Sequence, residues 1–200
     1  MIDVREITAL HKTTVAAWHE RAIDNPCEGL LRLVCFQHQQ NFRLWHQEDI
    51  ARSPNVGDTE VAGVKRSIDK LNQQRNDLIE RLDDFLIADL SASGVRPGTD
   101  ARLNTETPGS TIDRLSILSL RLYHMEEQVR RGDASESHVA KAQARLQVLG
   151  EQHRDLSNSL AELLDDLFAG RKRLKVYRQF KMYNDPTMNP YLYAAKRPAA

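Results

Sequence analysis

The stretch SESHVAKAQARLQVLGEQHRDLSNSLAELLDDLFAG, residues 135–170, carries the clearest structural signal in the sequence. Its apolar residues recur at alternating steps of three and four, which is the period of a helix packed along a heptad-like seam. Ser135 is suited to an N-cap, and Gly170 is suited to ending the helix. A period near 3.5 sustained over this length predicts a left-handed helical bundle with small crossing angles.

Four further segments show the same rhythm, and no segment alternates with the period of two that marks a strand. Breaks are predicted near Pro26, at Ser53 before Pro54, over residues 91–109 and at Gly132. The expected fold is all-α, an antiparallel bundle of about five long helices. We expect the bundle to occupy residues 1–170, and a basic, then aromatic and irregular C-terminal arm to occupy residues 171–200.

The composition excludes several classes of protein. The 200 residues include 28 basic and 28 acidic side chains, so no global field favours nucleic acid or an anionic membrane. The start of the sequence lacks a secretory hydrophobic region, and no segment approaches eighteen consecutive apolar residues. We therefore expect a cytoplasmic protein with no membrane span and no specific nucleic-acid partner. Cys27 and Cys35, about 12 Å apart on one predicted helix, are too distant for a disulfide.

Polar residues that interrupt the apolar seams are the informative exceptions, because burying an unpaired polar group is costly. A hairpin turning near residue 26 places His11 level with Asn41. A turn near residue 56 places Gln37 level with Arg75, and one near Gly132 sets Asp113 opposite His153. The interrupting residues are His11, Gln37, Asn41, Glu48, Arg75 and His153.

This polar layer has two interpretations. In the first, buried polar groups fix the register of the bundle and its choice of partner. In the second, they line a cavity for a polar ligand or substrate, where Arg75 holds an anion and Asp113 with His153 handles protons. If the first two helices form one kinked rod, the alignment of His11 fails.

Spacing argues against a conventional metal site on one helix. No glutamate has a histidine three residues later, and no two histidines lie four residues apart. We therefore expect no metal site and no cofactor, with Mg²⁺ as the alternative. Acidic groups that could bind Mg²⁺ are Glu80 with Asp83, and Glu48 and Asp49 beside His46. The sequence also lacks Walker, GxSxG and GxGxxG motifs.

The C-terminal arm begins with RKRLKVYRQFK, residues 171–181, which carries no acidic residue. Such a run either holds phosphates or simply complements the dipole of the preceding helix. The remainder is too apolar for a disordered tail, so we expect it to dock on its own bundle or on a second protein. That second protein is another copy of the chain or a different partner. The aromatic residues assigned to this role are Tyr177, Phe180, Tyr183, Tyr191 and Tyr193.

Four stretches together resemble a known bacterial family. They are LWHQEDIAR (residues 44–52), KRSIDKLNQQRNDLIERLD (65–83), NTETPGSTIDRLSILSLRLYHMEEQ (104–128) and VYRQFKMYNDPTMNPYLY (176–193). The family is the domain of unknown function 4254. The resemblance implies a small cytoplasmic helical protein, often encoded near glycosyltransferases of surface polysaccharide or lipopolysaccharide synthesis, with no assigned activity. The residues that match the family pattern are Asn72, Arg75, Asn76, Glu106, Asp113, Arg114 and His124.

Two functional hypotheses follow. The first is a non-enzymatic binding or assembly module that acts through the arm. The alternative is a small enzyme or ligand-binding protein for a phosphorylated or sugar-nucleotide ligand. Its candidate catalytic residues are Asp113, His153 and His124, and its candidate ligand-binding residues are His11, Asn41, Asn72, Arg75, Asn76, Glu106 and Arg114.

Overall fold

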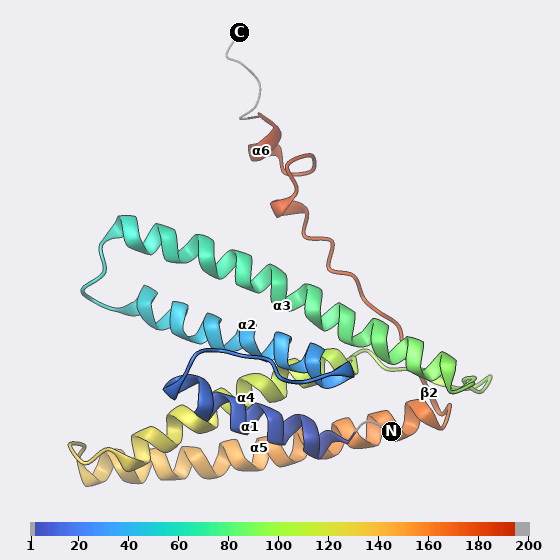
Figure 1. Cartoon of the computed structure of the whole chain (residues 1–200), viewed down its shortest axis with the longest axis horizontal. Helices are drawn as coiled ribbons and strands as arrows, with labels where there is room; N and C mark the ends of the chain where they lie inside the picture. Colours follow the sequence, from blue (N-terminus) through green and yellow to red (C-terminus); the bar gives the residue numbers. More distant parts are fainter. Residues whose placement is uncertain (1–2, 195–200) are drawn as a thin grey trace.

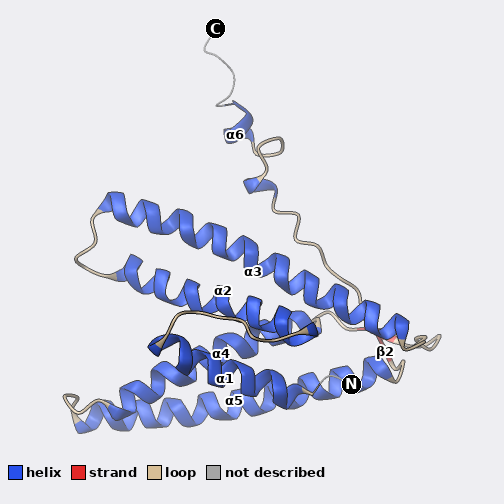
Figure 2. Ribbon diagram, viewed as in Figure 1, coloured by secondary structure: helices blue, strands red, loops and turns tan. Residues whose placement is uncertain are grey.

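The computed structural model of the chain describes residues 3–194. It confirms the all-α prediction, since long helices pack together with almost no strand (Figure 2). The long helices are α1 (Val4–Glu20), α2 (Gly29–Arg52), α3 (Asp58–Ala92), α4 (Pro108–Arg130) and α5 (Glu136–Phe168). The shorter elements are β1 (Arg102–Leu103), β2 (Lys172–Arg173), the 3₁₀ helix η1 (Met182–Asn184) and α6 (Pro190–Ala194).

The helix ends follow the predicted signals. The Thr107 hydroxyl accepts a hydrogen bond from the Ser110 amide at 3.1 Å, directly before Pro108 at the start of α4. The Ser135 hydroxyl accepts one from the amide of His138 at 3.3 Å and caps α5. These side chains satisfy amides that have no partner within the first helical turn.

Two antiparallel hairpins form most of the bundle, α2 with α3 and α4 with α5 (Figure 1). Near the α2–α3 turn, Leu44 packs with Val64 and Ile68 in a small separate cluster. The main core is shared by α1, α2, α3, α4 and α5. The first half of α4 is buried on several sides, as its broad apolar surface predicts, whereas residues 121–130 contain no buried residue.

The connection between α1 and α2 differs from the expected hairpin. The His11 ring lies 4.6 Å from that of His38, and the His19 ring lies 5.2 Å from that of His46, so the two helices run in the same direction. Residues 21–28 run back in extended conformation between them (Figure 1). This segment is held to α2, where Gln39 Nε2 donates to the Asp24 carbonyl at 3.0 Å. His11 therefore faces His38 and is not paired with Asn41.

At one end of the bundle, β1 pairs in parallel with β2. The pairing joins the loop after α3 to the chain that leaves α5. Gly170 has a φ of 70°, and a Cβ at this position would lie 2.8 Å from the Arg96 carbonyl oxygen. Only glycine fits this close approach without strain.

The arm runs along α3 in the reverse direction. Arg178 pairs with Glu80 at 3.1 Å and with Asp84 at 2.7 Å. Farther along, the Lys181 ammonium donates to the Asn72 carbonyl at 3.4 Å. The aromatic residues beyond these contacts remain exposed. Within residues 3–194, no helix combines the length and apolarity needed to cross a bilayer.

Candidate functional site

Asp113 is the centre of the predicted polar layer. Its carboxylate accepts hydrogen bonds from the side-chain amides of Gln37 and of Asn41, the latter at 2.9 Å, and lies 3.4 Å from Nε of Arg75. The structure therefore brings Gln37 and Arg75 together, as the α2–α3 hairpin predicts. Burial raises the pKa of Asp113, while the Arg75 charge and the two amides oppose that shift.

His153 does not face Asp113. Among the described residues, Asp113 is bonded to side chains of α2 and α3, whereas His153 of α5 lines a groove beside Lys12 and Ser119. The expected pair fails because α4 presents Asp113 to one side of the bundle and packs against α5 with another. A joint acid–base role for Asp113 and His153 therefore has no geometric support.

His11 and His38 form a buried histidine pair between α1 and α2. His38 Nδ1 lies 2.6 Å from the Ser116 hydroxyl, while both ring nitrogens of His11 are buried without a hydrogen-bond partner in the described part of the chain. Burial lowers the pKa of His38 to about 3 and lowers that of His11 in the same direction. Both rings are therefore held neutral.

The other predicted residues are distributed over separate places. The Glu106 carboxylate accepts two hydrogen bonds from Arg114, at 2.8 and 2.9 Å, and this pair lies at the surface. Asn41, Asn72 and Arg75 line a pocket of about 430 Å³. Asn76 is buried within α3. The predicted ligand residues therefore do not share a single cavity.

The acidic pair considered for Mg²⁺ is directed at protein groups. The Glu80 carboxylate pairs with Arg178 and accepts a hydrogen bond from the Gln179 amide. The Asp83 carboxylate accepts a hydrogen bond from the Gly109 amide at 2.7 Å. Burial raises the pKa of Asp83 to about 6. The two carboxylates therefore do not face a common ion position.

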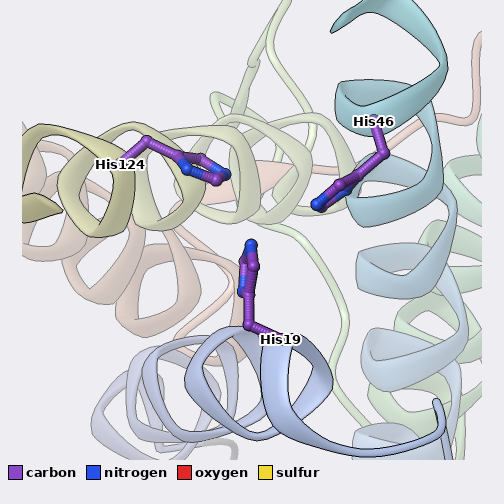
Figure 3. Close-up of side chains that lie close together, drawn as sticks. All are labelled: His19, His46 and His124. Carbon is purple, nitrogen blue, oxygen red and sulfur yellow. The ribbon is translucent and has the colours of Figure 1, made fainter. Parts of the chain in front are cut away.

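A different cluster combines His19 from the last turn of α1, His46 from α2 and His124 from α4 (Figure 3). One ring nitrogen of each lies within 4.8 Å of the corresponding nitrogens of the other two. The ring centroids are separated by 5.2 Å for His19 and His46, 5.1 Å for His19 and His124, and 6.0 Å for His46 and His124. Within residues 3–194 this is the one group of three metal-ligating side chains that converges in this way.

Hydrogen bonds fix which nitrogen of each ring is available. Nδ1 of His19 lies 2.7 Å from the Val15 carbonyl, and Nδ1 of His46 lies 2.8 Å from the Phe42 carbonyl. Because a carbonyl only accepts, each Nδ1 carries the proton and each Nε2 keeps a free lone pair. Nδ1 of His124 lies 2.7 Å from a Glu127 carboxylate oxygen, with the same result.

Aromatic side chains hold the three rings in place. The Tyr123 ring stacks on His19 at 4.3 Å, and the Trp45 ring stacks on His124 at 4.8 Å. Phe42 lies 4.4 Å from the His46 ring. In the described part of the chain, Nε2 of both His19 and His124 is buried without a hydrogen-bond partner. Two lone pairs are thus kept from water in positions where a cation would satisfy them.

The geometry fits a transition-metal ion. With metal–nitrogen distances of about 2.0–2.1 Å, a tetrahedral ion separates two ligand nitrogens by about 3.3 Å. The observed limit of 4.8 Å requires contraction by small side-chain rotations. Ligating histidines characteristically donate their other ring N–H to a carbonyl or carboxylate, as all three do here. Imidazole ligands suit zinc, nickel, copper and iron, whereas Mg²⁺ prefers oxygen ligands.

Sequence reasoning missed this cluster because it searched for ligand spacings within one helix. The three histidines come from three helices, and His46 lies beside His19 because α2 runs parallel to α1. A local signal was nevertheless present. Each of the three directly follows a tryptophan or tyrosine, in the pairs Trp18–His19, Trp45–His46 and Tyr123–His124, and none of the other four histidines does.

Comparison with known proteins identifies the family. A family model described as "Protein of unknown function (DUF4254)" matches residues 31–176, which is most of the chain. The chain belongs to this family. The DUF4254 match includes His46 and His124, and it begins after His19. No curated protein and no solved structure matches the chain.

Proposed function

We propose that this chain is a cytoplasmic metalloprotein that binds one zinc-class divalent ion through His19, His46 and His124. The observation that carries the proposal is the convergence of three Nε2 lone pairs whose Nδ1 hydrogens are already donated elsewhere. In this arrangement, the imidazoles need not change tautomer to bind the ion.

The ligand set favours a catalytic centre over a structural one. Structural zinc sites normally have four protein ligands, whereas catalytic sites combine three with an open position. No fourth histidine, cysteine or acidic residue within residues 3–194 joins the cluster. Three neutral imidazoles leave the full charge on the ion, and a bound ion of this kind supplies Lewis-acid chemistry and activates water near neutral pH.

Metal content tests the proposal directly. Purified protein dialysed against Zn²⁺ and then against metal-free buffer is expected to retain one ion per chain, measured by mass spectrometry of the metal. His46→Ala and His124→Ala are each expected to lose that ion. His138→Ala is the matched control, because His138 lies on α5 outside the cluster. Equal retention by His46→Ala and the control would exclude this site.

The open position has its own test. With Co²⁺ in place of Zn²⁺, a site with three protein ligands is expected to give a visible absorption spectrum that changes when azide is added. A spectrum insensitive to azide would indicate a closed coordination sphere and contradict the catalytic assignment.

A second function is supported by the arm, for which we propose a protein partner. Phe180 is 82% exposed, Tyr183 62% and Tyr191 87%, although these aromatic side chains would normally be covered. Basic residues of the arm are engaged within the chain. Arg178, close to Phe180 in sequence, pairs with Glu80 and Asp84, and Arg171 and Lys172 at the start of the arm both pair with Asp166. The resemblance to a family encoded near glycosyltransferases suggests such an enzyme of surface polysaccharide synthesis as the partner, with a second copy as the alternative.

Light scattering after gel filtration separates these partners. If copies associate through the arm, the double variant Tyr191→Ser with Leu192→Ser is expected to convert a dimer into a monomer. A chain that is already monomeric would direct attention to a different protein. If the double variant still binds a purified candidate glycosyltransferase as well as the unchanged chain does, the arm is not its binding surface.

A further inference from the structure

A pocket of about 570 Å³ lies between α4 and α5 and adjoins the histidine cluster. His124, a ligand in the proposed metal centre, and Trp45, which stacks on it, both line this pocket. The volume is within the range of about 300–1,000 Å³ typical of small-molecule sites. A molecule bound there would therefore contact a side chain of the metal centre.

The lining combines an apolar body with cationic groups. Met125, Val148 and Leu149 contribute apolar surface beside the Trp45 ring, and the Val148 side chain is about half exposed at 51%. The charged members are Arg121 from α4 and Arg145 from α5, and no carboxylate lines the pocket. Such a wall favours a ligand that is both apolar and negatively charged.

Neither of the two arginines forms an ion pair with a described acidic residue. Within residues 3–194, the arginines of α4 that form ion pairs are Arg114 with Glu106 and Arg130 with Glu126, and neither Arg121 nor Arg145 forms one. A guanidinium presents planar donors that match a carboxylate or phosphate group in two-point contact. One arginine from each helix can thus approach the same anion.

We propose that this pocket binds a small organic anion with an apolar body, its carboxylate or phosphate held by Arg121 and Arg145. The apolar part lies against Met125, Val148 and Leu149. Binding of the anion to this pocket does not depend on the proposed metal centre. Its role as the substrate of that centre rests on the proposed function.

Decanoate is a suitable probe, and Trp45 in the pocket wall provides a fluorescence signal for titration. Metal-free protein is expected to bind decanoate at least about 10-fold more tightly than decanol, because only the carboxylate forms charge-assisted hydrogen bonds. Acetate, which has the charge without the apolar body, is expected not to bind measurably. Equal affinity for decanoate and decanol would overturn the proposal.

Substitutions assign the binding to this pocket. Arg121→Gln is expected to weaken decanoate binding about 10-fold, and Val148→Glu is expected to abolish it by placing a carboxylate among the apolar groups. Arg154→Gln is the matched control, since Arg154 is an exposed arginine of α5 outside the lining. If Arg121→Gln binds as well as Arg154→Gln does, the anion is held elsewhere.

Zinc content measured on the same variants separates the two proposals. Arg121→Gln is expected to keep its ion while binding decanoate about 10-fold more weakly. Decanoate binding to a chain that never retains Zn²⁺ would support this pocket and contradict the metal centre. Retained Zn²⁺ without decanoate binding would support the metal centre and contradict the ligand pocket. Binding only to anionic lipid vesicles, and not to decanoate, would assign the arginines to a membrane surface and contradict the small-molecule ligand.

Discussion

Glu127 is the residue that most directly tests the metal centre without removing a ligand. Its carboxylate accepts the Nδ1 hydrogen of His124 at 2.7 Å and so fixes the tautomer and orientation of that ring. Replacing Glu127 with Gln keeps the size of the side chain and removes the charge. We expect zinc affinity to fall about 10-fold, measured by competition with a chromophoric chelator.

Glu126 provides the control for this substitution. It neighbours Glu127 but pairs with Arg130 at 2.8 Å, away from the cluster. Glu126→Gln is expected to leave zinc affinity unchanged. A similar loss in both variants would show that the effect is one of general charge and not of ring orientation.

His38 gives the fold a sensitivity to acid. Burial lowers its pKa to about 3, so the native protein keeps the ring neutral while the unfolded chain takes up a proton below about pH 6.5. The contribution of His38 to the free energy of unfolding should therefore be constant above that pH and fall by about 1.4 kcal/mol per unit as the pH drops from 6.5 towards 3. Urea unfolding of the wild type and of His38→Asn, between pH 7.5 and 5, measures this difference.

The comparison between variants is needed because a buried carboxylate acts in the opposite direction. The pKa of Asp83 is raised to about 6, so its contribution to stability is present in acid and is lost as the pH rises through that value. Asp83 is the same in both proteins, and its contribution cancels. Parallel pH curves for the wild type and His38→Asn would contradict the assignment to His38.

At the scale of elements, the contact between α3 and the start of α4 requires a glycine. A Cβ at Gly109 would lie 2.6 Å from the Ile79 carbonyl oxygen and 2.8 Å from the Asp83 carboxylate. Gly150, inside α5, has only a flexible Arg154 nitrogen, at 3.6 Å from the corresponding position. The same substitution should therefore have opposite effects at these two sites.

We expect Gly109→Ala to destabilise the protein by about 1–3 kcal/mol, because the backbone of α3 must shift. Gly150→Ala should stabilise it by about 0.5–1 kcal/mol, since alanine loses less conformational entropy in a helix. The midpoints of urea unfolding of the two variants, compared with that of the wild type, measure these changes in stability. Destabilisation by both would indicate that α5 is also closely packed at Gly150.

Most helix boundaries and the register between α2 and α3 could be predicted from the sequence. Thr107 and Ser135 mark helix starts because their hydroxyls satisfy local amides, and local chemistry is readable from neighbouring residues. The α2–α3 register was also predictable, because a short turn fixes it and brings Gln37 level with Arg75. The parallel strands β1 and β2 were not, since two residues carry no periodic signal.

At the scale of the whole molecule, the candidate site could not be predicted in the same way. The helix-breaking residues between positions 20 and 29 are compatible with a tight turn and with an extended crossover. A tight turn would make α2 antiparallel to α1, whereas the crossover makes the two helices parallel. The crossover is selected by distant contacts, such as the bond from Gln39 to the Asp24 carbonyl. With that choice, His19 and His46 meet; with a hairpin, they would lie apart.

The crossover has little slack. Measured from the facing pair His11 and His38, the chain must recover about 27 Å along the helix axes to go from the end of α1 to the start of α2. The linking residues 21–28 span only about 30 Å when extended. Deleting Arg21 and Ala22 shortens this reach by about 7 Å, to less than the distance required. The deletion should therefore displace His19 by about 4 Å along α2 and abolish zinc retention, whereas inserting two glycines there should preserve it. Retained zinc in the deletion variant would show that α1 can dock in another register.

The length of segment 21–28 therefore limits the position of α1 relative to α2. Surface loops generally accept changes of length in both directions, because their ends are placed by the elements they connect. Here the connection itself sets how far α1 can slide along α2, so lengthening is tolerated and shortening is not. Among related chains, insertions between these two helices would be compatible with the histidine cluster, and deletions would be expected only where the histidine at the end of the first helix has also been lost.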